Sequence, residues 1–167
     1  MGYRDASYVI FDGDNDKWAY TFMQGWKSNE NVDFDFEDAH DLDNMTSRAQ
    51  GEVYVKARLT ERMKKASAVI VLIGDSTKNL YRFVRWELDL ALELGLPIIA
   101  VNLNGSRSQD NLVPPIIRDK CVVHTSFKMK IIQHALDQWP NEFYSLEMDQ
   151  KNSVRYYNDA VYESLSI

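Results

Sequence analysis

Three near-continuous apolar runs, separated by stretches that fit amphipathic helices, constrain the fold of this chain more than any other feature. Short apolar runs bounded by turn residues are typical of strands that are buried on both faces. Parallel strands are joined by long, usually helical crossovers, and the spacing of the runs leaves room for them. The runs occupy residues 8–11, 68–73 and 98–103. The sequence therefore predicts an α/β fold, with a parallel sheet covered by helices on both faces.

Two weaker strand signals complete the predicted sheet. Residues 32–37 alternate apolar and acidic side chains, which is typical of a strand with one face in water and favours an edge position. A short strand is expected near residues 121–124. Five strands with an acidic second strand fit a flavodoxin-like three-layer sandwich with the parallel strand order 2-1-3-4-5. Helices are predicted at residues 17–27, 47–65 and 127–139. A further helix, capped by Thr77 or Asn79, is predicted to end at Leu94.

The length of 167 residues fits a single domain, with its core at about residues 7–140. Residues 141–167 contain several tyrosines, so we expect them to form a helical extension that packs on this core. No apolar stretch approaches the 18 or so residues that a membrane-spanning helix needs, and the first residues lack the pattern of a signal peptide. With Cys121 as the single cysteine, we expect a cytoplasmic protein without disulfides or a cysteine zinc site.

The formal net charge is −6, and no predicted element carries a basic stripe, so nucleic-acid binding is not expected. Many of the acidic residues lie in the segment 12–43. They fit a solvated acidic surface. The alternative, a metal site that includes His40, has little support, because the spacing of the carboxylates matches no known metal-binding loop.

In a flavodoxin-like fold, ligands bind outside the carboxyl ends of the strands, at the switch between the first and third strands. This geometry brings together the acidic loop 12–16, the loop 38–45, the segment 74–79 and the start of the next helix. The residues expected to line this crevice or to contact a substrate in it are Phe11, Asp12, Gly13, Asp14, Asp38 and Ser76.

Glu87 is the carboxylate whose position most needs an explanation. At about 100° per residue it falls inside the apolar stripe of its helix, between Leu80 and Leu94. Burying an unpaired carboxylate costs several kcal/mol or shifts its pKa. Two explanations fit the sequence: an ion pair with an arginine such as Arg58 or Arg62, or a functional role.

The segments 71–77, 82–87 and 98–104 resemble the TIR-like proteins of bacterial Thoeris antiphage systems. The first strand with its acidic loop fits as well, so the resemblance covers roughly residues 8–104. TIR enzymes carry an aromatic residue, usually tryptophan, four positions before a glutamate at the start of this helix. Phe83 takes the aromatic place in this chain, and Glu87 takes the place of the glutamate.

The resemblance implies chemistry on NAD+, as a substrate and not as a bound cofactor. TIR enzymes break the bond between nicotinamide and its ribose, and Thoeris TIR proteins make a cyclic ADP-ribose messenger that activates a separate effector. By this resemblance Glu87 would be catalytic, Phe83 would contact the substrate, and the protein would self-associate. A carboxylate suits the reaction because it stabilises the positive charge that develops on the ribose.

Two alternatives stay open beside an NAD+-consuming enzyme. The acidic loop after the first strand, together with Asp75, is also the pattern of a receiver domain, in which carboxylates bind Mg2+ and an aspartate accepts a phosphoryl group. The protein could also be a non-enzymatic TIR-type adaptor that only assembles with like domains. Replacement of Glu87 separates the adaptor from the enzyme, because an adaptor would keep its binding.

Overall fold

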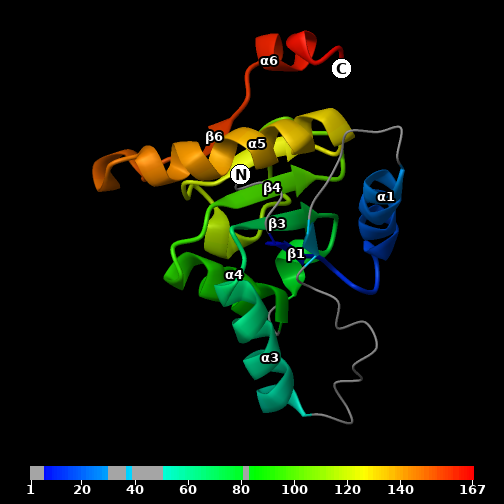
Figure 1. Cartoon of the computed structure of the whole chain (residues 1–167), viewed down its shortest axis with the longest axis vertical. Helices are drawn as coiled ribbons and strands as arrows, with labels where there is room; N and C mark the ends of the chain where they lie inside the picture. The colour runs from blue at the N-terminus through cyan, green and yellow to red at the C-terminus, as the bar shows by residue number, and fades with distance from the viewer. Residues whose placement is uncertain (1–5, 30–36, 39–50, 81–82) are drawn as a thin grey trace.

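The computed structural model describes residues 6–29, 37–38, 51–80 and 83–167, whose arrangement is seen in Figure 1. These residues form one parallel sheet of six strands in the order β2-β1-β3-β4-β5-β6. The predicted order 2-1-3-4-5 and the edge position of the second strand are confirmed, but the predicted sheet of five strands lacks β6. The strands are β1 (Ala6–Ile10), β2 (Glu37–Asp38), β3 (Ala68–Ile73), β4 (Ile98–Asn102), β5 (Val123–Ser126) and β6 (Arg155–Tyr156).

The middle of the sheet is buried on both faces. Every residue of β3 and of β4 is buried, and Val69 of β3 lies opposite Tyr8 on one side and Ile98 on the other. Strands covered in this way need apolar side chains at successive positions, which explains the continuous runs in the sequence. Removal of this aliphatic surface from water contributes about 25 cal/mol per Å² to stability.

Helices cover both faces of the sheet. Tyr8 and Ile10 of β1 join the core under α3 and α4, whereas Val9 joins the core under α1 and α5, because successive strand residues point to opposite faces. Figure 1 shows α3 next to α4, with α5 across the strands from them. The helices are α1 (Lys17–Ser28), α3 (Glu52–Lys64), α4 (Phe83–Glu93), α5 (Met129–Ser145) and α6 (Asp159–Ser164), with single 3-10 turns at η3 (Thr77–Asn79), η4 (Pro115–Ile117) and η5 (Met148–Gln150).

Several predicted boundaries are wrong. The helix after β5 does not end at residue 139 but continues through Pro140 to Ser145, because its buried face extends to Phe143 and outweighs the hydrogen bond that proline removes. Thr77 and Asn79 do not begin α4; they form η3. β5 begins two residues later than expected. Most of the predicted strand 32–37, and the beginning of the predicted helix 47–65, lie outside the described residues.

Residues 141–167 are not a purely helical extension. After α5 the chain returns to the sheet as β6, where Arg155 lies opposite Val123 of β5, and then forms the short helix α6. Tyr162 of α6 is fully buried, and its hydroxyl accepts a hydrogen bond from the backbone amide of Ser126 at 3.1 Å. The end of the chain is therefore fastened to the carboxyl end of β5.

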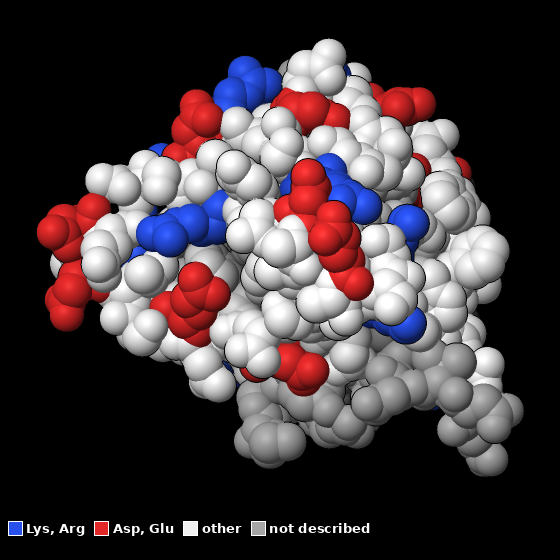
Figure 2. All heavy atoms as spheres, turned by 90° about the horizontal axis from the view of Figure 1, so that it is seen from above, with Lys and Arg blue, Asp and Glu red and all other residues white. Residues whose placement is uncertain are grey.

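No helix within the described ranges is long and apolar enough to cross a membrane. On the face of the molecule seen in Figure 2, basic and acidic side chains are interspersed, without a continuous basic area. This face therefore lacks the basic patch that binds the phosphate backbone of nucleic acids.

Candidate active site

Glu87 lies in the second turn of α4, and its side chain is 4% exposed. Its helix neighbours Val84, Leu88 and Ala91 are buried as well, so the predicted position of Glu87 inside the apolar stripe is confirmed. α4 follows β3, and such a crossover helix runs back along the sheet from the carboxyl ends of the strands. The carboxyl group is therefore held against the sheet, one turn below the edge where ligands bind in folds of this type.

Tyr8 of β1 is one partner of Glu87: its hydroxyl donates a hydrogen bond to Oε2 of the carboxyl group. Burial raises the pKa of Glu87 to about 8, and the bond from Tyr8 opposes this rise because it favours the charged form. Most Glu87 side chains are therefore protonated at neutral pH. A group whose pKa lies this close to neutral pH changes its charge with small changes in its surroundings, as acid–base and charge-stabilising residues do.

The ion-pair explanation fails for one of the two arginines that the sequence suggests. Arg58 lies on the surface of α3, where its guanidinium is 4.0 Å from the carboxylate of Glu61. Burial, followed by the bond from Tyr8, accounts for the pKa of Glu87.

Asp12 organises the loop after β1. Its Oδ1 accepts hydrogen bonds from the backbone amides of Asp14 at 3.0 Å and Asn15 at 3.2 Å. Its Oδ2 accepts from the side-chain amide of Asn15 and from the hydroxyl of Ser76, both at 2.8 Å. Burial acts to raise the pKa of Asp12, but the hydrogen bonds outweigh it and lower the pKa. Asp12 is therefore a charged side chain that ties the loop after β1 to the loop after β3.

Asp16 fastens the same two loops at a second point. The hydroxyl of Thr77 lies 3.3 Å from Oδ2 of Asp16 and accepts a hydrogen bond from the amide of Gly74 at 2.9 Å. Burial, together with the charge of Asp12, raises the pKa of Asp16. A Cβ atom at residue 74 would lie 2.7 Å from Cγ of Asp16 and closer still to its oxygens. Glycine is required at this position because the buried aspartate occupies the space.

The structure does not bring Phe11 to Glu87. Glu87 meets Tyr8 on the face covered by α4, whereas Phe11 packs against the core of the opposite face. There its ring stacks on Tyr20, with the ring centroids 4.7 Å apart.

The other predicted site residues lie around the loops at the carboxyl edge. Gly13 and Asp14 are exposed in the turn after β1. Phe83 is the first residue of α4 and is half-buried against the core. Asp38 pairs with β1 through its backbone, and its side chain, like the loop 39–45, lies outside what the structure describes.

Within the described ranges, no group of three or more His, Cys, Asp and Glu side chains could hold a metal ion. His40 lies outside these ranges. Of the two carboxylates on which the receiver alternative depends, Asp12 is bound by its own loop and by Ser76, and Asp75 is exposed. Because an Mg2+ ion would have to replace the hydrogen bonds of Asp12, the geometry does not favour a phosphoacceptor.

Sequence reasoning missed Tyr8. The sequence offers one signal for it: a phenol hydroxyl in an otherwise aliphatic buried run needs a hydrogen-bond partner. The sequence does not say which side chain that partner is, because it lies on another element of the fold.

The fold and the site together define a class: a flavodoxin-like α/β protein of the TIR-like type, with a buried glutamate on the helix that follows the third strand. Residues 7–108 match the family described as Thoeris protein ThsB, TIR-like domain. This match covers well over half of the chain, so the protein belongs to that family of antiphage defence proteins. Comparison with curated proteins gives no match. The family match ends in the loop after β4, so β5, α5, β6 and α6 lie beyond it.

Proposed function

We propose that this protein cleaves NAD+ between nicotinamide and ribose and closes the remaining ADP-ribose into a cyclic signalling molecule. The observation that carries the proposal is Glu87, a buried carboxyl group with a raised pKa on the helix where TIR enzymes place their glutamate. Membership of the Thoeris TIR-like family supports the same chemistry.

Bond cleavage requires a group that stabilises positive charge on the ribose. The electron pair of the bond between C1′ and the nicotinamide nitrogen moves to that nitrogen, and nicotinamide leaves as a neutral molecule. The leaving group therefore needs no general acid. The charge that was on the ring passes to the ribose as an oxocarbenium-like centre, and an ionised Glu87 beside it lowers the energy of the transition state.

The charge state of Glu87 is coupled to the substrate. Burial keeps the carboxyl group of Glu87 mostly neutral at pH 7. A cation beside a carboxyl group favours its ionised form, so the charged nicotinamide ring would lower the pKa of Glu87 as NAD+ binds. Tyr8 holds the carboxylate through its hydroxyl while this change takes place.

Cyclisation completes the reaction within the same molecule. A hydroxyl of the second ribose, or a nitrogen of the adenine, attacks C1′, and one proton is released. The balance is NAD+ giving cyclic ADP-ribose, nicotinamide and H+. The product would act as a diffusible signal on a separate effector, and self-association of the TIR-like protein would exclude water from the site during the attack.

The test is mass spectrometry of NAD+ incubated with the wild-type protein and with Glu87→Gln, both pure and in lysate from phage-infected cells. Asp89→Asn is the matched control, because Asp89 is an exposed carboxylate on the same helix. We expect nicotinamide and a product with the mass of cyclic ADP-ribose from the wild type and the control, and neither from Glu87→Gln. Intact NAD+ under every condition would contradict the proposal and favour the adaptor.

A further inference from the structure

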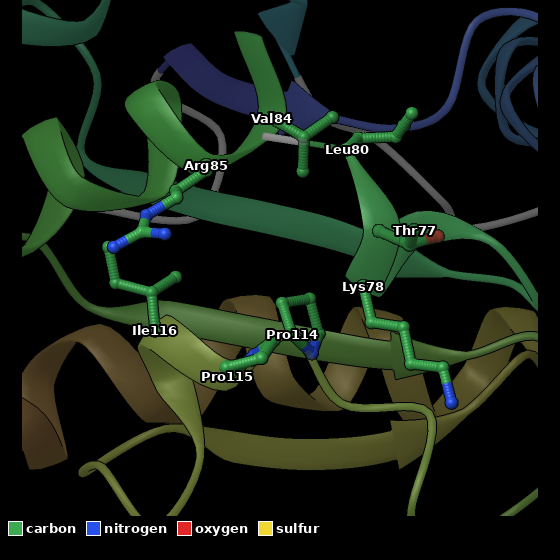
Figure 3. A pocket seen from close by; sticks show the side chains of 8 residues that line it. All are labelled: Thr77, Lys78, Leu80, Val84, Arg85, Pro114, Pro115 and Ile116. Carbon is green, nitrogen blue, oxygen red and sulfur yellow. The ribbon is translucent and has the colours of Figure 1, made fainter. Parts of the chain in front are cut away.

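A pocket of about 180 Å³ lies between η3, the start of α4 and η4. Its walls are mostly apolar and include Leu80, Val84 and the consecutive prolines Pro114 and Pro115, with the prolines across the pocket from Leu80 and Val84 (Figure 3). Figure 3 shows Arg85 reaching from α4 toward Ile116 at one end of the pocket, with Lys78 at the other end. The pocket therefore combines an apolar middle with a cation at each end.

Both cations are available to a ligand. Within the part of the chain that the structure describes, the guanidinium of Arg85 makes no ion pair or hydrogen bond, and the ammonium of Lys78 makes one long contact, 3.4 Å to the carbonyl of Asn111. The backbone amide of Arg85 already donates to the carbonyl of Leu80 at 3.2 Å. An anion in the pocket would therefore be bound by these two side chains and not by this amide.

This pocket is separate from the site at Glu87. Arg85 and Glu87 are two residues apart on α4, which places them about 200° apart around the helix axis. Glu87 faces Tyr8 of β1, whereas Arg85 faces η4. The two sites lie on opposite flanks of one helix turn.

From the pocket's size, walls and charges we infer that it is a second ligand site, which binds a small organic anion made of one flat apolar ring and a phosphate or carboxylate group. A cavity of about 150 Å³ with apolar walls can hold a benzene molecule, so this pocket has room for one ring system but not for a whole dinucleotide. The ring would pack between the prolines and Val84, and the anionic group would bind Arg85 or Lys78. Such charge-assisted hydrogen bonds are stronger than neutral ones.

Ligand binding at this site would also act on the neighbouring elements. Val84 lies one turn before Glu87 on α4, and Thr77, which lines the pocket, holds Gly74 and Asp16. A bound anion would therefore stabilise the start of α4 and the loop after β3 together, which makes this an effector site for the protein.

The experiment is titration of the Glu87→Gln protein with two probes, adenosine monophosphate and nicotinate, followed by calorimetry and by the backbone amide NMR signals of Lys78, Arg85 and Ile116. Adenosine and nicotinamide are the neutral counterparts. The variants are Arg85→Gln and Lys78→Gln, and Arg118→Gln and Lys120→Gln are their controls, because both are exposed cations outside the pocket.

We expect one of the two anions to bind. Binding of adenosine monophosphate would identify the ligand as a nucleotide, and binding of nicotinate would identify it as an aromatic carboxylate. The affinity of the anion that binds should exceed that of its neutral counterpart, fall about tenfold in Arg85→Gln or in Lys78→Gln, and stay unchanged in the controls. The proposal is overturned if neither anion binds at millimolar concentration, if the Arg85 and Lys78 substitutions in the Glu87→Gln protein leave its affinity unchanged, or if the NMR changes centre on Tyr8 and β1. Since the experiment measures no turnover, its outcome is independent of NAD+ cleavage.

Discussion

The hydroxyl of Tyr8 and the carboxyl group of Glu87 meet although the two residues are 79 positions apart in the sequence. Both side chains are buried, and each is a polar group in a core of aliphatic neighbours. The bond therefore fastens α4 to β1 at the point where the proposed chemistry takes place. An unsatisfied buried polar group costs about 1–3 kcal/mol. The pair therefore also favours this packing of α4 on β1 over any packing that would separate the two groups.

Replacement of Tyr8 by phenylalanine should move the pH dependence of activity. The bond from Tyr8 lowers the pKa of Glu87, so its loss raises this pKa above about 8. If ionised Glu87 is the active form, kcat/KM for NAD+ increases as the pH rises, and the increase should come at higher pH in Tyr8→Phe. Tyr20→Phe is the control, because Tyr20 is a buried tyrosine on the other face of the sheet. An identical profile for wild type and Tyr8→Phe would show that Tyr8 does not position Glu87.

Glu87→Gln should make stability less dependent on pH. In the unfolded chain Glu87 ionises near its ordinary pKa of 4.5, whereas in the folded protein it keeps its proton up to about pH 8. Between these values only the unfolded chain loses the proton, so the free energy of unfolding falls as the pH rises, by roughly 1.4 kcal/mol per unit at most. Glutamine cannot ionise. Urea unfolding at about pH 5 and about pH 8 should therefore show a smaller loss of stability in the variant than in the wild type.

His124 should have the opposite effect on the pH dependence of stability: its contribution makes the protein more stable as the pH rises, and it does so at lower pH. It is fully buried on β5, and its Nδ1 lies 3.4 Å from the side-chain nitrogen of Asn102. Burial lowers the pKa of His124 to about 4, although the charge of Asp110 opposes this. The contribution of His124 to the free energy of unfolding is therefore fully present above the unfolded pKa of 6.5, and it is lost as the pH falls toward 4.

The test is acid unfolding of His124→Asn, in which the slope between these two pKa values should be reduced whatever the absolute stability of the variant. His134→Asn on α5 is the control for the loss of a histidine elsewhere in the fold. An unchanged slope in His124→Asn would mean that other groups govern acid unfolding.

Gly74→Ala should destabilise the protein, because the new methyl group would overlap the buried carboxylate of Asp16. Crowding of this kind costs about 1–3 kcal/mol, and here it also disturbs the contact of Asp16 with Thr77. Gly25→Ala in α1 is the matched control. Nothing lies within 4 Å of a Cβ atom at residue 25, so alanine should stabilise that helix by about 0.5–1 kcal/mol. Equal thermal midpoints for the two variants would contradict the steric role of Gly74.

The sequence was sufficient to predict the core of the sheet, because strands buried on both faces, such as β3, leave an unbroken apolar run that a helical period does not explain. It was also sufficient to place Glu87 in the buried stripe of α4. It could not predict β6, since two residues are too few to form a pattern and their position depends on the exposed edge of β5. The predicted helix end before Pro140 was wrong, because packing along the whole of α5 outweighed the tendency of proline to end a helix.

Prediction of the candidate active site from the sequence has the same limit. Residue types and loop positions predicted that Asp12 and Ser76 would lie close together, and the structure joins them by a hydrogen bond. The link between Tyr8 and Glu87 depends on how α4 lies across β1, and the requirement for glycine at residue 74 depends on a carboxylate from another loop. Contacts between distant elements leave no periodic signal in the sequence, so they become visible only in the folded chain.

β6 has a consequence for how copies of this protein can come together. A long, unpaired outer strand would let a neighbouring molecule continue the sheet through main-chain bonding, which is insensitive to side-chain identity. Here β6 pairs with the first two residues of β5 and is itself only two residues long, so this side of the sheet offers little backbone to extend. Any filament or oligomer that uses this side has to be held by side chains, and single substitutions on its surface can then abolish assembly without affecting the fold.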